Sequence, residues 1–539
     1  MTEGNGEVRE LPKGWALTTV GEAIKIIDYR GRTPPYSEDG IPHLRSSNIR
    51  NRKIVWEDLR YVSEETYQAY MTRGLPEKDD VLFTTEAPLG EVALAPDQRF
   101  SLAQRMMILR PNKDLLSSKF LLYQIEDENF QKKLKNSGTG TTVTGVSSRN
   151  FQPISILLAP IYEQERIVEK IEELFSELDQ GIENLKTAQK QLKVYRQAVL
   201  KWAFEGKLTE QWRQQAQQQG TLKTGEELLA QIKAERENRY QQQVAAWEAA
   251  VKTWEANGKP GKKPSKPSKP KDLAPLPHNQ VADLPSLPDS WKWIQLGEVL
   301  DDIEAGKSFR CEERPPRANE IGVAKVSAVT WGEYDESESK TCLEQDKTEE
   351  KFLIEAEDFL FSRANTIELV GACVIAKRVT LRVMLSDKTL RFKFSKSINQ
   401  KFILHFLKSR YGRNEIERLA TGNQESMRNI GQDRILRIRT PFPHPFEQEQ
   451  IVQEIESRLS NCDQLETTIA ENLQKAEALR QSILKQAFEG KLVPQDPTDE
   501  PAEKLLERIR AEKAKRQPPG KQMTIKMSRS KEDANDLED

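Results

Sequence analysis

The sequence predicts an α+β fold in which one unit, a globular α/β domain followed by a long helix, occurs twice. Three observations predict it: motifs recur in the same order in both halves, each half holds about 40 residues with apolar side chains at helical spacing, and short apolar runs between turn residues precede each such stretch. Because each long helix has an apolar stripe to cover, we expect two antiparallel, coiled-coil-like helices in a pseudo-two-fold arrangement between the domains.

The duplication rests on four pairs of matching segments. Residues 11–15, 119–122, 163–168 and 203–208 match residues 287–291, 401–404, 447–452 and 487–492, at separations of 276, 282, 284 and 284 residues. A separation that drifts so slowly indicates one duplicated unit with small insertions. The predicted boundaries are residues 1–160 and 285–445 for the globular domains, 161–208 and 446–492 for the long helices, 209–284 for a connector and 493–539 for a tail.

Each globular domain is predicted to follow the same plan. Residues 80–83 and 358–361 read as buried strands, and a helix follows at about residues 117–135 and 399–419. Glycine-bearing loops come next, and a further strand ends at a proline before the long helix.

The long helices carry apolar residues at steps of three and four, which is a heptad seam. The first seam runs through Ile167, Ile171, Leu174, Leu178, Ile182, Leu185, Ala188, Leu192, Tyr195 and Val199. The second runs through Ile451, Ile455, Leu459, Cys462, Leu465, Ile469, Leu473, Ala476, Leu479 and Ile483. Pairing of the two helices is our interpretation; the alternative is that each helix packs on its own domain.

The connector is predicted to contain a helix over residues 226–256, in which Trp247 and Trp254 share one face as packing anchors. Residues 258–271 hold six lysines and four prolines, which is typical of a stiff, solvated spacer; contact with phosphates is the alternative. The tail begins with residues 503–506, which resemble 226–229, and residues 527–539 are expected to be disordered.

Composition excludes several classes of protein. Of 539 residues, 37% are hydrophobic and 31% are charged, and the net charge of -2 excludes a uniformly basic nucleic-acid coat. The sequence shows no apolar run of about 18 residues and no signal peptide, so we expect a cytoplasmic protein without a membrane span. The four cysteines form no CxxC pair and the four histidines are scattered, which argues against a disulfide scaffold or a metal site.

Catalytic signatures are missing from the sequence. It has no phosphate-binding GxxxxGK[ST] loop, no dinucleotide-binding GxGxxG after a strand, no HExxH and no GxSxG. The Asn-Pro-Pro-aromatic tetrad of amino-methylating DNA methyltransferases is also missing. We therefore expect a noncatalytic reader or scaffold, with no catalytic residues and no cofactor of its own.

Polar loops with hydrogen-bond donors recur in both globular domains. Arg forks onto guanine, Asn bridges adenine, and Ser or Thr reaches base edges or phosphate, so these loops are candidate DNA contacts. The alternative is that the side chains cap turns. The candidates are Arg32, Thr33, Arg45, Ser46, Ser47, Asn48, Arg50, Thr84 and Thr85 in the first domain, and Lys307, Ser308, Arg310, Ser327, Arg363, Asn365 and Thr366 in the second.

The chain resembles the specificity subunit of type I restriction–modification systems. The resemblance rests on residues 11–22, 40–49 and 82–90 in the first half, 359–371 in the second half, and the two Glu-Gln-Glu helices that end in Phe-Glu-Gly-Lys-Leu. It covers about residues 10–210 and 285–515; the connector looks like an expansion of the usual middle region.

The resemblance implies a noncatalytic subunit with two target-recognition domains, each reading half of a split site in double-stranded DNA. The long helices would set the spacing and dock two modification subunits, which would in turn bring the restriction–translocase subunits. S-adenosylmethionine, ATP and Mg²⁺ would belong to those partner chains. A coiled-coil scaffold without a DNA role and an enzyme, such as a nuclease or fused methyltransferase, are the alternative interpretations.

Overall fold

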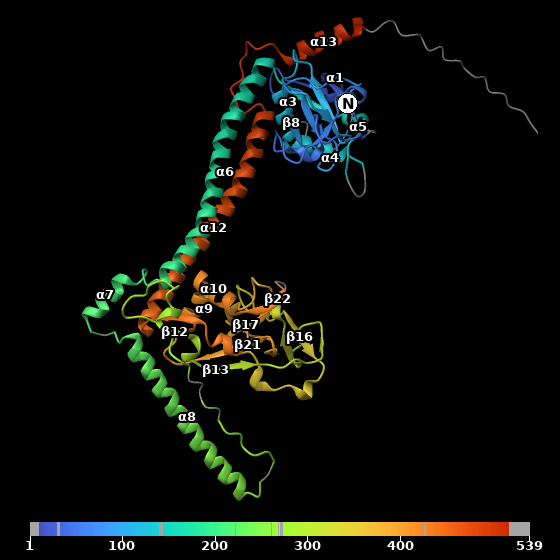
Figure 1. The fold of residues 1–539 in the computed structure, drawn as a ribbon. Helices are drawn as coiled ribbons and strands as arrows, with labels where there is room; N and C mark the ends of the chain where they lie inside the picture. The colour runs from blue at the N-terminus through green and yellow to red at the C-terminus, as the bar shows by residue number, and fades with distance from the viewer. Residues whose placement is uncertain are drawn as a thin grey trace, which may run out of the picture. The chain divides into compact units, whose positions relative to one another are not determined.

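The computed structural model describes residues 10–29, 33–139, 144–220, 222–259, 261–267, 269, 273–424 and 427–516 (Figure 1). It divides into two compact units, Met1–Leu185 with Ala470–Asp539, and Lys186–Ile469. The long helices α6 (Ile161–Phe204) and α12 (Pro445–Phe488) each contribute to both units. Each unit therefore contains one globular domain, the start of the long helix that follows this domain, and the end of the other long helix.

The first domain is built on a four-stranded antiparallel sheet in the order β2-β10-β7-β8. Its strands are β2 (Ile24–Asp28), β7 (Val81–Thr84), β8 (Val92–Leu94) and β10 (Met106–Pro111). All four residues of β7 are buried, because the sheet has a core on each face: Val81 and Phe83 pack against the helices, and Leu82 packs on the opposite side.

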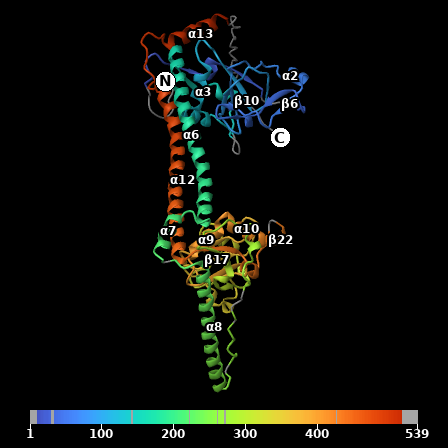
Figure 2. The same ribbon diagram turned by 60° about the vertical axis from the view of Figure 1, so that its left-hand side comes forward.

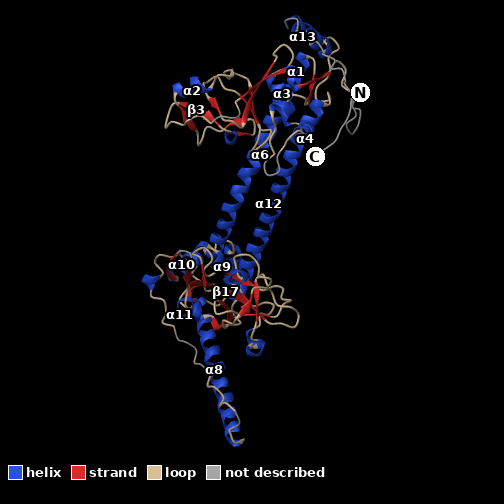
Figure 3. Cartoon of the chain, turned by 90° about the vertical axis from the view of Figure 1, so that its right-hand side faces the viewer, coloured by secondary structure: helices blue, strands red, loops and turns tan. Residues whose placement is uncertain are grey.

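Smaller elements complete the first domain (Figure 3). The strands are β1 (Ala16–Thr19) paired with β11 (Ser155–Leu158), a sheet of β3 (Ile41–Leu44), β6 (Arg60–Val62) and β9 (Ser101–Leu102), and a hairpin of β4 (Ile49–Arg50) and β5 (Lys53–Ile54). The helices are α1 (Val20–Ala23), α2 (Glu64–Tyr70), α3 (Ser118–Glu126), α4 (Glu128–Asn136) and α5 (Ser148–Phe151).

The second domain repeats this plan. Its central antiparallel sheet has the order β13-β21-β17-β19, formed by β13 (Leu300–Ala305), β17 (Phe359–Ser362), β19 (Cys373–Ile375) and β21 (Thr389–Phe394). β12 (Lys292–Gln295) pairs with β24 (Arg439–Phe442) as β1 pairs with β11. β15 (Gly322–Ala324) lies antiparallel to β16 (Ser339–Cys342) and parallel to β20 (Val383–Met384), just as β3 lies between β6 and β9.

Further strands and helices belong to the second unit. They are β14 (Cys311–Glu312), a sheet of β18 (Ala364–Asn365), β22 (Thr421–Gln424) and β23 (Met427–Asn429), and the connector helices α7 (Glu210–Gln218) and α8 (Gly225–Ala256). The domain's own helices are α9 (Gln400–Lys408), α10 (Arg410–Leu419) and α11 (Gln432–Ile435).

The single helix predicted after the strands is two helices in each domain. Asp127 is extended and its carboxylate accepts hydrogen bonds from the backbone of Asn129 and Phe130, so α3 ends and α4 begins there. Ser409 does the same between α9 and α10, with its hydroxyl accepting from Gly412. The apolar period continues across both breaks, which is why it did not reveal them.

The long helices pair antiparallel (Figure 2). In the first unit, Ile167 and Ile171 share a core with Leu484 and Phe488, and Asp179, further along α6, binds Arg480, earlier in α12. In the second unit, Val199 of α6 shares a core with Ile451 and Ile455, and Arg196 lies 2.6 Å from Asp463. The predicted pairing is thus present, and the helix ends also pack on the domains, as the alternative held.

The buried seam differs from the predicted one at three positions. Leu178, Ile182 and Leu185 are half-buried, and Leu174, Leu459, Ile469 and Ile483 are buried or half-buried, as a seam requires. Tyr195, Leu465 and Leu479 are instead exposed. Their neighbours Arg196, Glu466 and Arg480 occupy the seam and form ion pairs across it.

The duplicated motifs hold each domain to the helices. Trp15 donates its indole N–H to Glu163 over 3.0 Å, and Trp291 donates to Glu447 over 2.8 Å. The amides of Gln164 and Gln448 bind backbone groups just before α3 and α9; the side-chain oxygen accepts from Ser117 and Asn399 at 2.9 Å in both. The recurring Glu-Gln pair is therefore a structural tie between helix and domain.

Glycines at the helix ends complete the frame. Gly206 and Gly490 have positive φ angles of 72° and 67°, which end α6 and α12. They lie against Pro288 and Pro12, the prolines of the duplicated Leu-Pro motif, so the end of each helix contacts the other repeat's domain. The last described helix, α13 (Ala502–Arg516), packs on the first domain; the region predicted to be disordered, residues 527–539, lies outside the described residues.

Candidate nucleic-acid interface

The second domain has an open hollow of about 650 Å³ on its surface. It is lined by loops that the sequence places far apart, and it brings together three predicted contact residues, Ser308, Ser327 and Asn365. These residues come from the loop after β13, the short helical turn at Val326–Ala328, and strand β18. The sheet of the second domain thus collects donors from three separate segments in one place.

Charged side chains surround this hollow. Lys325, Lys340 and Lys388 line it together with Glu313 and Asp387. Lys340 forms an ion pair with Glu313, whose pKa is lowered chiefly by this contact, whereas Lys388 has no ion pair among the described residues. Cations beside hydroxyl and amide groups are suited to a ligand with both phosphates and base edges.

The predicted side chains in the hollow differ in how they are engaged. Ser308 donates to Asp387 at 2.8 Å and Ser327 donates to Glu338 at 2.5 Å. Asn365 accepts from the backbone of Thr366 at 2.8 Å, which leaves its amide N–H groups without a partner among the described residues. Asn365 is therefore the predicted residue best placed to donate to a base.

The remaining predicted residues of the second domain lie close by in the chain. Arg310 is exposed, and Lys307 is exposed and paired with Glu349. Arg363 is half-buried, with its Nε 3.4 Å from the Asn429 side chain, and Thr366 caps the turn that follows through its carbonyl.

In the first domain, the loop at residues 45–50 is folded on itself. Asn48 is buried, accepts from the Arg45 backbone at 3.0 Å and donates to two further carbonyls of the loop. Arg45 donates to Asp58, and Arg50 donates to the carbonyls of Ser46 and Ile49. Of the loop's predicted contacts, Ser47 alone is exposed, so the capping alternative holds for Asn48 and Arg50.

The other predicted contacts of the first domain differ in exposure. Ser46 is buried and donates to the Ala87 carbonyl at 3.2 Å. Thr84 and Thr85 are buried. Thr84 ends strand β7, which is covered on both faces, and its hydroxyl accepts from the Glu91 backbone; Thr85 follows the strand directly. Thr33 is exposed, and Arg32 lies outside the described residues.

Comparison with known proteins places this architecture. The model of the type I restriction modification DNA specificity domain matches residues 12–187 and 288–475. The chain belongs to this family. It is 23% identical over 528 residues to the EcoKI specificity subunit of Escherichia coli K12, covering 94% of this chain and 97% of the relative. It is 22% identical over 524 residues to the StySPI specificity subunit of Salmonella potsdam, covering 94% and 96%.

Solved structures share the fold. An HsdS subunit from Thermoanaerobacter tengcongensis superposes with a TM-score of 0.53 at 20% identity, covering 91% of this chain and 100% of the other. A chain from a type I system solved to explain complex assembly and conformational transition gives a TM-score of 0.58 at 19% identity, covering 90% and 100%. Family membership confirms a noncatalytic specificity subunit that recognises DNA sequence.

This specificity subunit has several exposed groups that were not predicted from its sequence. Tyr36 and Trp56 of the first domain are 41% and 40% exposed, and the Arg60 guanidinium lies 4.5 Å from the Tyr36 ring centroid. Aromatic residues inside polar loops were the available signal, because exposed rings stack on bases or sugars. Lys340 and Lys388 of the second domain had no such signal, since lone lysines are common on any surface.

Groups for other chemistry are sparse in the described residues. Within those ranges, no three His, Cys, Asp or Glu side chains gather so as to hold a metal ion, and no helix combines the length and apolar character needed to cross a membrane. Burial lowers the pKa of His43 to about 4; its Nδ1 lies 2.8 Å from the Ser101 hydroxyl, so it is a neutral core residue.

Proposed function

We propose that each globular domain of this specificity subunit reads one half of a bipartite DNA sequence, from the major groove. The observation that carries the proposal is that both domains are held to the helices by the same contacts but expose different polar loops. The contacts of Trp15 with Glu163 and of Trp291 with Glu447 recur, while the loops that face solvent differ. Two different surfaces on matching domains suit two different half-site sequences.

The second domain offers the clearer reading surface. Among the described residues, the amide N–H groups of Asn365 in the hollow have no hydrogen-bond partner and Lys388 has no ion-pair partner. In the first domain we assign the reading surface to Ser47, Thr33 and the exposed group of Tyr36, Trp56 and Arg60. Arg45 stays a candidate there, because its contact with Asp58 is exposed and gives way at little cost.

The long helices are proposed to set the distance between the half-sites. A helix of 44 residues, such as α6, is about 66 Å long at 1.5 Å per residue. Half-sites one turn of DNA apart are about 34 Å from each other, which is within that length. We expect the pairing of the two helices to hold this distance.

Docking of two modification subunits is the second part of the proposal. The second residue of α6, Tyr162, is 63% exposed, and the second residue of α12, Phe446, is 59% exposed. A large exposed aromatic side chain at the same place in both repeats suits a binding partner present in two copies. S-adenosylmethionine, ATP and Mg²⁺ would act in those partner chains and in the restriction–translocase subunits that they bring.

A domain exchange tests the proposal. Residues 10–160 are replaced by the matching domain of a relative with a known target, and the methylated sites are mapped in cells that also express the modification subunits. We expect one half of the methylated sequence to change and the other half to stay. A matched exchange of residues 285–445 should change the opposite half. An unchanged methylated sequence in both chimaeras, with the complex assembled, would contradict the proposal.

A further inference from the structure

The start of the connector helix α8 resembles the start of α13, but α8 is longer. Residues 225–233 match residues 502–510 at the start of α13, with Leu228, Leu229 and Ile232 in the places of Leu505, Leu506 and Ile509. Both segments begin with the same contact, since Gly225 N–H donates to the Ser290 carbonyl and Ala502 N–H donates to the Gly14 carbonyl. After this shared part, α8 continues to Ala256.

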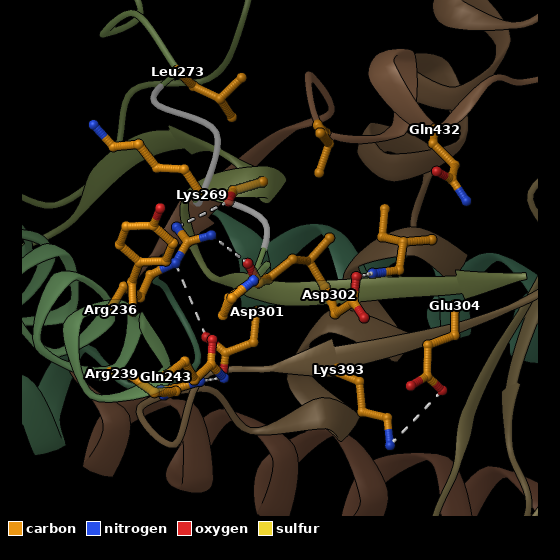
Figure 4. A pocket seen from close by; sticks show the side chains of 16 residues that line it. Arg236, Arg239, Gln243, Lys269, Leu273, Asp301, Asp302, Glu304, Lys393 and Gln432 are labelled. Atoms are coloured by element: carbon orange, nitrogen blue, oxygen red, sulfur yellow. Dashed lines mark hydrogen bonds and ion pairs between the residues drawn. The ribbon is translucent and has the colours of Figure 1, made fainter. Parts of the chain in front are cut away.

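The base of the extension is fixed to the second domain (Figure 4). Arg236 donates to the carbonyls of Gly297, Glu298 and Leu300, and Arg239 binds the Asp301 carboxylate at 2.5 Å. These side chains border a cavity of about 680 Å³ between α8 and strand β13. The helix therefore leaves the domain from an anchored position.

The chain returns to the place that it left. The same cavity is lined by Tyr240 and Gln243 on the outgoing helix and by Pro267, Lys269 and Leu273 on the returning segment. The intervening residues are thus not needed to span any distance between the domain's parts. Together with Pro267 and Lys269 of the returning segment, they form an excursion, residues 244–259, 261–267 and 269, which we call the arm.

The arm is an ordered pair of segments. The Trp247 indole N–H donates to the Pro264 carbonyl at 2.9 Å, and the Lys266 ammonium lies 5.6 Å from the Trp247 ring centroid. Lys259 lies 5.9 Å from the ring of Trp254, one heptad further along. The two tryptophans therefore hold the lysine-rich segment against α8, which a plain spacer does not require. The chain that follows α8 runs back beside this helix (Figures 1 and 2).

Positive charge is concentrated on this arm. It carries Lys252, Lys259, Lys262, Lys263, Lys266 and Lys269 against Glu248 and Glu255, a net charge of +4 in a chain whose total is -2. All six ammonium-bearing residues are exposed, and among the described arm residues no large hydrophobic side chain is. Such a surface lacks the apolar groups that protein or membrane partners bind.

We propose that the arm binds the phosphate backbone of duplex DNA outside the half-site read by the second domain, without regard to base sequence. The occupant follows from charge complementarity, since exposed lysines act as point charges toward phosphates and carry no base readout. This inference rests on the proposed DNA-reading function, because the arm is anchored to the domain assigned to read the second half-site.

The test compares binding of a fluorescent duplex without a target site at salt concentrations from 50 to 200 mM. The full-length chain is used in complex with its modification subunits, with Lys259, Lys262, Lys263, Lys266 and Lys269 changed to Ala. Each phosphate contact contributes about 0.9 to the slope of log K against log salt. We expect the slope to fall by about 2 to 4 and binding at 50 mM salt to weaken about 10- to 100-fold. Changing the same five residues to Arg keeps the charge and should leave binding as in the wild type.

Four outcomes would contradict the proposed DNA contact of the arm or the proposed function. An unchanged slope in the alanine variant, or an equal loss in the arginine variant, would overturn the inference. Loss of modification-subunit binding with an unchanged salt slope would also overturn it, in favour of a protein partner. If the wild-type complex does not bind DNA at all, the proposed function itself fails, and that outcome is distinct from the failure of the arm alone.

Discussion

The two units hold their domains to the helices with matching contacts, yet they differ where loops reach solvent. Gln164 and Gln448 make the same backbone bonds, and Gly206 and Gly490 lie against matching prolines. In the first domain, the Asn48 side chain holds its own loop closed, whereas in the second domain Asn365 lines an open hollow. In this chain, the recurring sequence motifs mark the frame, and the divergent loops mark the reading surfaces.

The largest expected effect tests a place where the two frames differ. Glu447 is buried and binds Arg213 at 2.8 Å. Glu163, also buried, binds Trp15 and Gln495 and forms no ion pair with an arginine of the described part of the chain. Glu447→Gln leaves the buried Arg213 without a carboxylate and should cost about 3–5 kcal/mol. Glu163→Gln keeps an acceptor for Trp15 and should cost at most about 1 kcal/mol. Hydrogen exchange of each unit measures both, and equal losses would contradict the asymmetry.

The helix-ending glycines should behave alike. A Cβ at Gly206 overlaps Pro288 and one at Gly490 meets Pro12, both at positive φ. Each Gly→Ala change should destabilise its unit by about 2–4 kcal/mol through backbone strain and overpacking. Gly220 is a matched control, because its φ is +67° but nothing lies within 4 Å. Gly220→Ala should cost only about 1 kcal/mol; a similar loss at all three glycines would remove the proline contact from the account.

Acid should weaken both units through one neutral histidine in each, buried His43 and half-buried His405. Burial lowers the pKa of His43 in the first unit and of His405 in the second to about 4, below the ordinary 6.5. The folded state then binds fewer protons than the unfolded state between these values, so stability is full above pH 6.5 and falls toward pH 4. For His43 the loss at pH 5 should be about 2 kcal/mol.

Unfolding measured from pH 7 to pH 4.5 checks this dependence. His43→Gln should flatten the profile of the first unit and leave the second unchanged, and His405→Gln should do the reverse. A profile that keeps its slope in both variants would show that other groups cause the acid sensitivity.

The smallest effect concerns the ion pairs of the helix seam. Arg480 pairs with Asp179, and Arg196 pairs with Asp463 at 2.6 Å; the two pairs are related by the 284-residue repeat. Both aspartates are exposed, so Asp179→Ala and Asp463→Ala should each cost under about 1 kcal/mol, and the double variant should show the sum. Thermal unfolding measures the three, and a cost above about 2 kcal/mol for one alone would break the symmetry.

The sequence was sufficient for the repeated fold because motifs and apolar periods are local features. The seam prediction was wrong at Tyr195, Leu465 and Leu479, which are exposed. Apolar spacing selected these residues, but a charged neighbour of each occupies the seam. Arg196 and Glu466 are tolerated there since each finds its partner on the other helix, which a single-helix pattern does not reveal.

The reading surface was harder to predict. Asn48 and Asn365 look alike in the sequence. The Asn48 amide donates to a carbonyl of its own loop, whereas Asn365 lines the hollow. That difference depends on which backbone carbonyls the fold brings near each amide. Likewise, Lys388 is a candidate contact only because loops far away in the chain form the hollow that it lines.

The central claim, that one frame carries two independent readers, is tested most directly by a chain with the same reader twice. Residues 285–445 are replaced by a second copy of residues 10–160, and methylated sites are mapped in cells that express the modification subunits. The account predicts sites that contain the first half-site sequence twice and lack the second. Methylation at the original sequence, or none from an assembled complex that binds DNA, would contradict it.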